Sequence, residues 1–152
     1  MEQRVDFYRV APEGVKALAG LDAKVSALGL EPRLLELVRL RASQINGCAY
    51  CVDLHTRDAG RHGETDRRLH AVAVWREAPS FTPRERAALG WTESLTCIAD
   101  TRAPDVDFAA LQAQFSEAEM VNLTLAIGLI NSWNRIAVGF RKQPAAEPGA
   151  AS

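Results

Sequence analysis

The stretch PRLLELVRLRASQINGCAYCVDLHTRDAGRHG, residues 32–63, predicts two helices joined by a short turn. Pro32 suits the first turn of a helix, and leucine and valine residues recur behind it at helical spacing. The residues SQING, 43–47, interrupt this pattern with the polar side chains and glycine that are typical of a turn. A second helix is predicted from about Cys48 to His62, where a glycine ends it.

Helical patterns extend over most of the remaining chain. Capping boxes, formed by Thr82 with Glu85 and by Ser116 with Glu119, mark the starts of two helices. No stretch has a convincing strand pattern. Further helices are predicted at residues 12–28, 65–78, from 83 onward and 117–140. The sequence therefore predicts an all-α protein with a single helical domain over residues 1–143 and a disordered tail at 144–152.

The last helix has the apolar segment MVNLTLAIGLI, which is apolar on nearly every side. A helix of this kind is buried. Polar residues, among them Asn122, Thr124 and Asn131, interrupt it before it reaches the length of a membrane span. Because a small domain cannot easily bury every side of one helix, we expect this helix to form a subunit interface.

Composition excludes several classes of function. The formal net charge of the 152-residue chain is −1, so there is no basic surplus that would favour nucleic acid or an anionic membrane as a partner. Three cysteines are an odd number, which argues against the disulfide framework of a secreted protein. The first ten residues carry charges where a signal peptide needs an apolar run. These features predict a cytoplasmic protein whose thiols begin reduced.

Two cysteines and a histidine share one face of the second helix. At about 100° per residue, Cys48, Cys51 and His55 fall on the same side, with Cys51 one turn from His55, whereas Tyr50 points away. Both cysteines lie in the first turn, where unpaired N–H groups and the helix dipole favour a thiolate. A neighbouring imidazole can accept a thiol proton, and a second cysteine can form a disulfide with an oxidised first one. The pattern indicates a two-cysteine redox site.

Two other interpretations compete with a redox site. The residues could be structural, with two small buried thiols and a hydrogen-bonded core histidine. A structural zinc site would need four ligands, usually from two separated pairs, but the chain has one Cys-x-x-Cys with His55 and an isolated Cys97. Thiol redox chemistry is favoured over both, and no pattern indicates a metal or another cofactor. Cys97 is interpreted as a passive thiol, and His62 as a helix-end histidine.

The segment ELVRLRASQINGCAYCVDLHTRDA, residues 36–59, resembles the core of the alkylhydroperoxidase D family, within the carboxymuconolactone decarboxylase-like superfamily. The shared motif is a glutamate, eleven residues, Cys-x-x-Cys, three residues and a histidine. Here it consists of Glu36, Cys48, Cys51 and His55, with every spacing kept.

This resemblance, which covers roughly residues 15–140, implies an all-α fold that assembles into trimers or hexamers and reduces organic hydroperoxides. It implies a proton relay from Glu36 and His55 to Cys51. Cys51 would then attack the peroxide and become a sulfenic acid, and Cys48 would condense with it to a disulfide. A dithiol, such as a lipoyl group on a partner protein, would restore the pair. We expect Cys48, nearer the helix end, to be the more exposed cysteine and to meet that partner.

Several alternatives stay open from the sequence. Without the resemblance, Glu36 is interpreted as a solvated carboxylate paired with Arg33 or Arg39. Tyr50 stands where the resemblance would place a histidine beside the second cysteine. Asn131, Asn134 and Arg135 form a polar cluster that could lie at a subunit interface or at the mouth of the active site. Peroxide reduction is the leading function; a general disulfide oxidoreductase or redox relay, or a non-enzymatic redox-responsive oligomer, are the alternatives.

Overall fold

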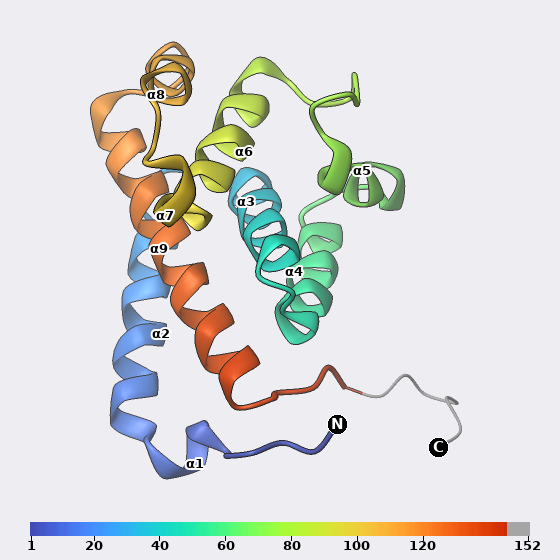
Figure 1. Ribbon diagram of the computed structural model, residues 1–152, viewed down its shortest axis with the longest axis vertical. Helices are drawn as coiled ribbons and strands as arrows, with labels where there is room; N and C mark the ends of the chain where they lie inside the picture. Colours follow the sequence, from blue (N-terminus) through green and yellow to red (C-terminus); the bar gives the residue numbers. More distant parts are fainter. Residues whose placement is uncertain (146–152) are drawn as a thin grey trace.

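A computed structural model describes residues 1–145 of the chain, and in this range it is helical throughout, with no strand (Figure 1). The all-α prediction is therefore confirmed, whereas the predicted tail lies largely at 146–152, outside the described residues. The helices are α1 (Phe7–Val10), α2 (Pro12–Ser26), α3 (Pro32–Ile45), α4 (Ala49–Arg61), α5 (Asp66–Ala71), the 3₁₀ turn η1 (Val72–Val74), α6 (Pro83–Thr96), α7 (Ile98–Thr101), α8 (Asp105–Gln112) and α9 (Glu117–Gly139).

Helix α3 is the central element, and it contacts α4, α6 and α9. One of its faces, with Leu35 and Val38, packs into the core shared with α6, α8 and α9. Another face, with Leu37 and Leu40, packs against α4, α5 and α6 in a second core. Burial on opposite faces forces the polar residues of α3 inside as well, so that polar side chains on this helix must find partners within the protein.

The N-terminal segment folds back over the far end of α9. Figure 1 shows α2 and α9 side by side, with the N-terminal segment near the C-terminal end of α9. The backbone N–H of Arg4 donates to the carbonyl of Phe140 over 3.0 Å, and its side chain donates to the carbonyl of Gly139 over 3.1 Å. Helix α1, which the sequence did not predict, follows this anchor and buries Phe7.

Helix boundaries agree with the capping signals but not everywhere with the apolar pattern. Both predicted capping boxes are present. The helix predicted from Thr65 to residue 78 ends at Ala71, because the chain tightens into η1 and then turns. The helix predicted from residue 83 onward ends at Thr96, so that Ile98, which would continue its apolar spacing, lies beyond α6 and is 53% exposed. The hydroxyl of Thr101 bonds the Ser94 carbonyl over 2.6 Å, which satisfies an acceptor that the shortened helix leaves free.

Helix α9 buries one side against α2, α3 and α6. Its other side is open in the single chain, where Val121, Leu125 and Val138 are 59%, 45% and 48% exposed. Association through this apolar surface stays a prediction. No helix in residues 1–145 is both long and apolar enough to cross a membrane.

Candidate active site

The two cysteines lie together at the start of α4. Gly47, with φ of +65°, adopts the left-handed conformation that turns the chain from α3 into α4. Cys48 is the N-cap of α4, and its sulfur accepts the backbone N–H of Cys51 over 3.3 Å. The Sγ atoms of Cys48 and Cys51 lie 2.5 Å apart. Residues 48 and 51 can therefore form a disulfide bond without a rearrangement of the helix.

Cys48 is no more exposed than Cys51, so the prediction about its exposure is wrong. The exposed fractions are 2% for Cys48 and 3% for Cys51. A position at a helix start would leave a side chain open, but Ala42 of α3 and Ile130 and Ala137 of α9 pack over this end of α4. The packing of α9, which is far away in sequence, decides the access to both sulfur atoms.

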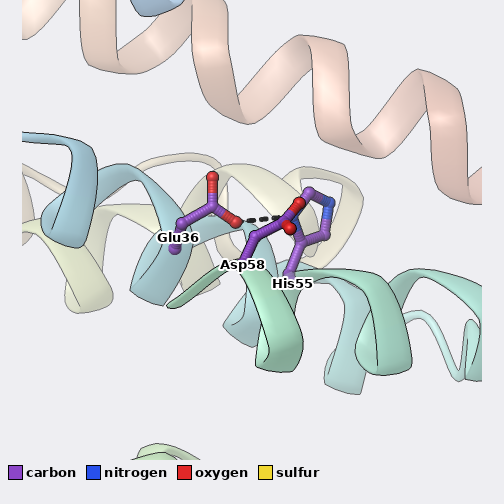
Figure 2. Close-up of side chains that lie close together, drawn as sticks. All are labelled: Glu36, His55 and Asp58. Carbon is purple, nitrogen blue, oxygen red and sulfur yellow. Dashed lines mark hydrogen bonds and ion pairs between the residues drawn. The ribbon is translucent and has the colours of Figure 1, made fainter. Parts of the chain in front are cut away.

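His55 is held by a buried carboxylate. Its Nδ1 lies 2.8 Å from Oε2 of Glu36, and the exposed fractions are 9% for His55 and 5% for Glu36. Figure 2 shows Glu36 reaching from α3 to the ring of His55 on α4. With Glu36 ionised, Nδ1 carries the proton and donates, which leaves Nε2 as a proton acceptor.

Glu36 is not a solvated carboxylate, so that interpretation is wrong, although the pairing with Arg39 is correct. Nη1 of Arg39 donates to its Oε1 over 2.6 Å, whereas Arg33 binds Glu64 instead. Burial opposes the ionisation of Glu36. The hydrogen bonds and charges of His55 and Arg39 outweigh burial and hold the pKa of Glu36 below its ordinary value.

Arg39 connects this pair to two further helices. Its Nη2 donates to Oδ1 of Asp22 over 2.8 Å and to the hydroxyl of Ser26 over 2.5 Å. The other carboxylate oxygen of Asp22 accepts the indole N–H of Trp133 over 3.1 Å. A chain of hydrogen bonds thus runs from His55 through α3 to α2 and α9, and it fixes the position of Glu36 from several sides.

A pocket of about 210 Å³ opens beside this network, and Cys51 and His55 both line it. Cys48 does not line it. Most of its other walls are apolar or aromatic, contributed by Phe7, Tyr8, Ala19, Tyr50, Leu54, Trp133 and Ala137. The prediction that Tyr50 points away from the thiols is wrong. Tyr50 packs against the apolar cluster that contains both cysteines, and it lines the same pocket as Cys51. Residues of α1 and α9 form walls of this pocket, so the site is wider than one face of α4.

A profile of the carboxymuconolactone decarboxylase family matches residues 12–94, a range that includes Glu36, Cys48, Cys51 and His55. The chain belongs to this family. It is 37% identical over 147 residues to the uncharacterised protein YdfG of Bacillus subtilis, a match that covers 97% of this chain and all of YdfG. The resemblance inferred from the motif is therefore confirmed at the level of the superfamily.

Solved structures of similar chains confirm the fold of this family member. A protein of unknown function from Agrobacterium tumefaciens, which has been proposed to be the antioxidant defence protein AhpD, is 47% identical, with a TM-score of 0.94 over 96% of this chain and all of that one. The debrominase Bmp8 has a TM-score of 0.81 over 89% of this chain and 73% of its own, at 20% identity. At this lower identity, the comparison shows the fold alone.

The two thiols of this family member differ in acidity. The pKa of Cys48 is lowered to about 7, chiefly by the hydrogen bond from the Cys51 thiol, and also by the Cys51 backbone N–H and the amide of Asn134, against the effect of burial. The pKa of Cys51 is raised by its hydrogen bond to Cys48, by burial and by the charge of Cys48. The position of Cys51 one turn from His55 favours Cys51 as the thiol that gives up its proton. In the reduced pair, the hydrogen bond from the Cys51 thiol instead makes Cys48 the stronger acid, with a smaller contribution from the backbone N–H at the N-cap.

This difference predicts a thiolate near neutral pH. In a Cys97→Ser background, absorbance at 240 nm should rise with an apparent pKa of about 7 as the first proton leaves the pair. The Cys48→Ser variant should lose this transition, because the remaining Cys51 has no N-cap contact to the backbone. A transition that survives in Cys48→Ser would assign the acidic thiol to Cys51.

The asparagines near the end of α9 bind within the chain and approach the thiols. The side-chain nitrogen of Asn46 donates to the side-chain oxygens of Asn131 over 3.0 Å and Asn134 over 2.8 Å. Asn134 also donates to the hydroxyl of Ser43 over 3.0 Å, and it favours the thiolate form of both cysteines. Asn134 therefore lies beside the cysteine pair, as in one of the two placements left open by the sequence.

A third titratable group, Asp58, adjoins the pair of Glu36 and His55 (Figure 2). One ligand atom from each lies within 4.8 Å of the others, and in residues 1–145 no other group of three such side chains has metal-ligand spacing. Both carboxylates already bind arginines, Glu36 through Arg39 and Asp58 through Arg61 over 2.6 Å. The arrangement therefore fits an acid–base pair better than a metal centre, and neither cysteine belongs to the cluster.

The remaining candidates lie away from the thiols. His62 is the exposed C-cap of α4 and does not line the pocket. Cys97 is half-buried at the C-terminal end of α6. The sequence did not indicate Asp22 and Trp133 as site residues, although they reach the site from α2 and α9. No motif near either residue in the sequence points to the cysteines or to His55.

Proposed function

We propose that this chain is a thiol-dependent peroxidase that reduces an organic hydroperoxide through a Cys48–Cys51 disulfide. The observation that carries the proposal is the shared pocket: Cys51 and His55 line the same small apolar space, and Glu36 holds Nδ1 of His55. An apolar pocket accommodates the organic part of the hydroperoxide, while the thiol and the imidazole supply the chemistry.

The first half of the reaction takes place at Cys51. Nε2 of His55 accepts the thiol proton, and the thiolate attacks the terminal oxygen of the hydroperoxide. The O–O bond breaks, the sulfur becomes a sulfenic acid, and the leaving alkoxide takes the proton back from His55 to depart as an alcohol. Because the pKa of Cys51 is raised above its ordinary value, this thiol needs a base to react at neutral pH.

Cys48 completes the cycle. Its thiolate attacks the Cys51 sulfur, a disulfide forms, and hydroxide leaves and is protonated to water. A dithiol then reduces the disulfide and is itself oxidised, and a lipoyl-type group on a partner protein is the kind of reductant we propose. Sulfur carries both electrons, so the cycle uses no metal, haem or flavin. We further propose that the chain works as a homo-oligomer, a trimer or hexamer, which would cover the apolar side of α9.

Single-turnover and steady-state measurements test this proposal. With cumene hydroperoxide and dihydrolipoamide, the wild type should turn over repeatedly, and Cys51→Ser should fall to the uncatalysed rate. In the absence of dithiol, Cys48→Ser should consume about one equivalent of hydroperoxide and then stop, because its sulfenic acid has no partner thiol. Mass spectrometry should find the added oxygen on Cys51.

Failure of this test would have a definite meaning. If the wild type forms the disulfide with a general oxidant but consumes no hydroperoxide above background, the peroxidase proposal is wrong. A redox relay would then be distinguished from a redox-responsive oligomer by measuring the oligomer size before and after oxidation.

A further inference from the structure

Access to the cysteine pair is one-sided. Both sulfur atoms are almost completely buried, but only Cys51 lines the pocket, while Cys48 is enclosed by α3 and α9. A thiol that reduces the Cys48–Cys51 disulfide must reach one of the two sulfur atoms. The open route leads to Cys51, the same atom that meets the peroxide in the proposed cycle.

We propose that the reductant enters through this pocket and attacks Cys51, so that the mixed disulfide forms on Cys51 while Cys48 is expelled. This inference rests on the proposed function for the disulfide and its dithiol reductant. It reverses the roles expected from position along the helix, where Cys48 would meet the partner. One pocket then serves both half-reactions in turn.

The proposed step balances as a thiol–disulfide exchange. A thiolate of the reductant attacks Sγ of Cys51, the bond between Cys51 and Cys48 breaks, and Cys48 leaves as a thiolate. The second thiol of the reductant then attacks the reductant's other sulfur, which is bonded to Cys51 in the mixed disulfide. Cys51 leaves with the electron pair and is protonated, and the reductant departs as a disulfide, having lost two electrons.

Cys48 is also the better leaving group. Its sulfur accepts the backbone N–H of Cys51 at the N-terminus of α4, and the amide of Asn134 stabilises its anionic form. These contacts lower the pKa of Cys48, and a thiol of lower pKa leaves faster in an exchange reaction. Access and leaving-group stability thus favour the same direction of attack.

The pocket limits the shape of the reductant. A space of about 210 Å³ admits a dithiol at the end of a slender arm, whereas the broad surface around a globular protein's active-site thiol cannot follow it to Cys51. Tyr8 and Tyr50 line the pocket, and Nζ of Lys142 lies 5.7 Å from the ring centre of Tyr8 and 5.8 Å from that of Tyr50. We therefore infer a flexible, largely apolar dithiol, free or attached to a carrier.

Trapping of the mixed disulfide tests the site of attack. The Cys97→Ser protein, oxidised with diamide, is exposed briefly to 2-mercaptoethanol and is quenched in acid so that exchange stops. A monothiol completes the reduction only through a second, bimolecular attack, so the mixed disulfide can be trapped at short times. After alkylation of free thiols, fragmentation of the peptide should place 2-mercaptoethanol on Cys51 and the alkyl group on Cys48, with at least about a tenfold preference. An adduct mainly on Cys48, or an equal mixture, would overturn the inference.

A pocket-blocking variant tests the route independently. Ala19 is exposed and lines the pocket, whereas Ala23, one turn further along α2, is exposed but does not. Ala19→Trp should slow reduction of the oxidised protein by dihydrolipoamide about tenfold or more, and the matched control Ala23→Trp should leave it unchanged. Equal rates in the two variants would show that the reductant does not enter here.

Neither experiment uses peroxide, so their outcomes separate the two proposals. A Cys48 adduct in a protein that turns over hydroperoxide overturns the access route and leaves the proposed function intact. A Cys51 adduct in a protein without peroxide turnover supports the access route and overturns the peroxidase.

Discussion

Replacement of His55 with alanine is expected to lower kcat/KM for an organic hydroperoxide by about 10²–10⁴-fold, the usual contribution of a general base. The pKa of Cys51 is raised by Cys48 and by burial, so few molecules hold the Cys51 thiolate without a proton acceptor in the pocket. The residual rate should rise with pH, because hydroxide must then remove the proton. Glu36→Gln should cause a smaller loss, since it leaves the imidazole in place and changes only its orientation and tautomer.

Two controls separate this effect from damage to the fold. His62→Ala removes an exposed histidine from the end of the same helix and should leave the rate unchanged. Added imidazole, which fits the space left beside the pocket, should restore part of the rate of His55→Ala but none of Cys51→Ser. If His55→Ala retains the wild-type rate and pH profile, His55 is not the base, and the proton of Cys51 must pass to Cys48.

Local periodicity was sufficient to predict the part of the site that comes from one helix. Cys48, Cys51 and His55 lie within eight residues of α4, and helical geometry alone places them on one side. The capping boxes at Thr82 and Ser116 were predicted for the same reason, because every atom of each interaction belongs to four consecutive residues.

Features that depend on contacts between distant helices were not predictable from the residues alone. Nothing near Glu36 in sequence shows that α4 will pack against its side of α3, and only the family motif indicated a link with His55. Trp133 meets Asp22 across 111 positions of the chain. The burial of Cys48 has the same origin. A position at the start of a helix predicts an exposed side chain, but residues of α9 pack over Cys48 and bury it.

Arg39→Met is expected to lower the free energy of unfolding by about 3–5 kcal/mol, the range found when one partner of a buried ion pair is removed. Arg39 is the shared donor to Glu36 over 2.6 Å and to Asp22 over 2.8 Å, and its side chain is only 11% exposed. Methionine fills most of the volume but leaves two carboxylates without their cation. Chemical denaturation at pH 7 measures the loss.

A matched exposed pair provides the control. Arg57 binds Asp53 over 2.8 Å on α4, but their side chains are 50% and 36% exposed. Arg57→Met should therefore cost less than about 1 kcal/mol, as is usual for ion pairs at the surface. Equal losses in the two variants would mean that Arg39 contributes through its length and packing rather than through its charge.

The pH dependence of Arg39→Met gives a second test. Glu36 has a pKa below the ordinary carboxyl value in the folded protein, so its interactions stabilise the fold above that ordinary value, and this stability is lost as the pH falls through the lowered pKa. The stability difference between wild type and Arg39→Met should thus be largest near neutral pH and shrink in acid. Combining Arg39→Met with Glu36→Gln should recover part of the loss at pH 7, because the buried charge that lacks a partner is removed. A difference that stays constant from neutral to acidic pH would contradict an electrostatic role for Arg39.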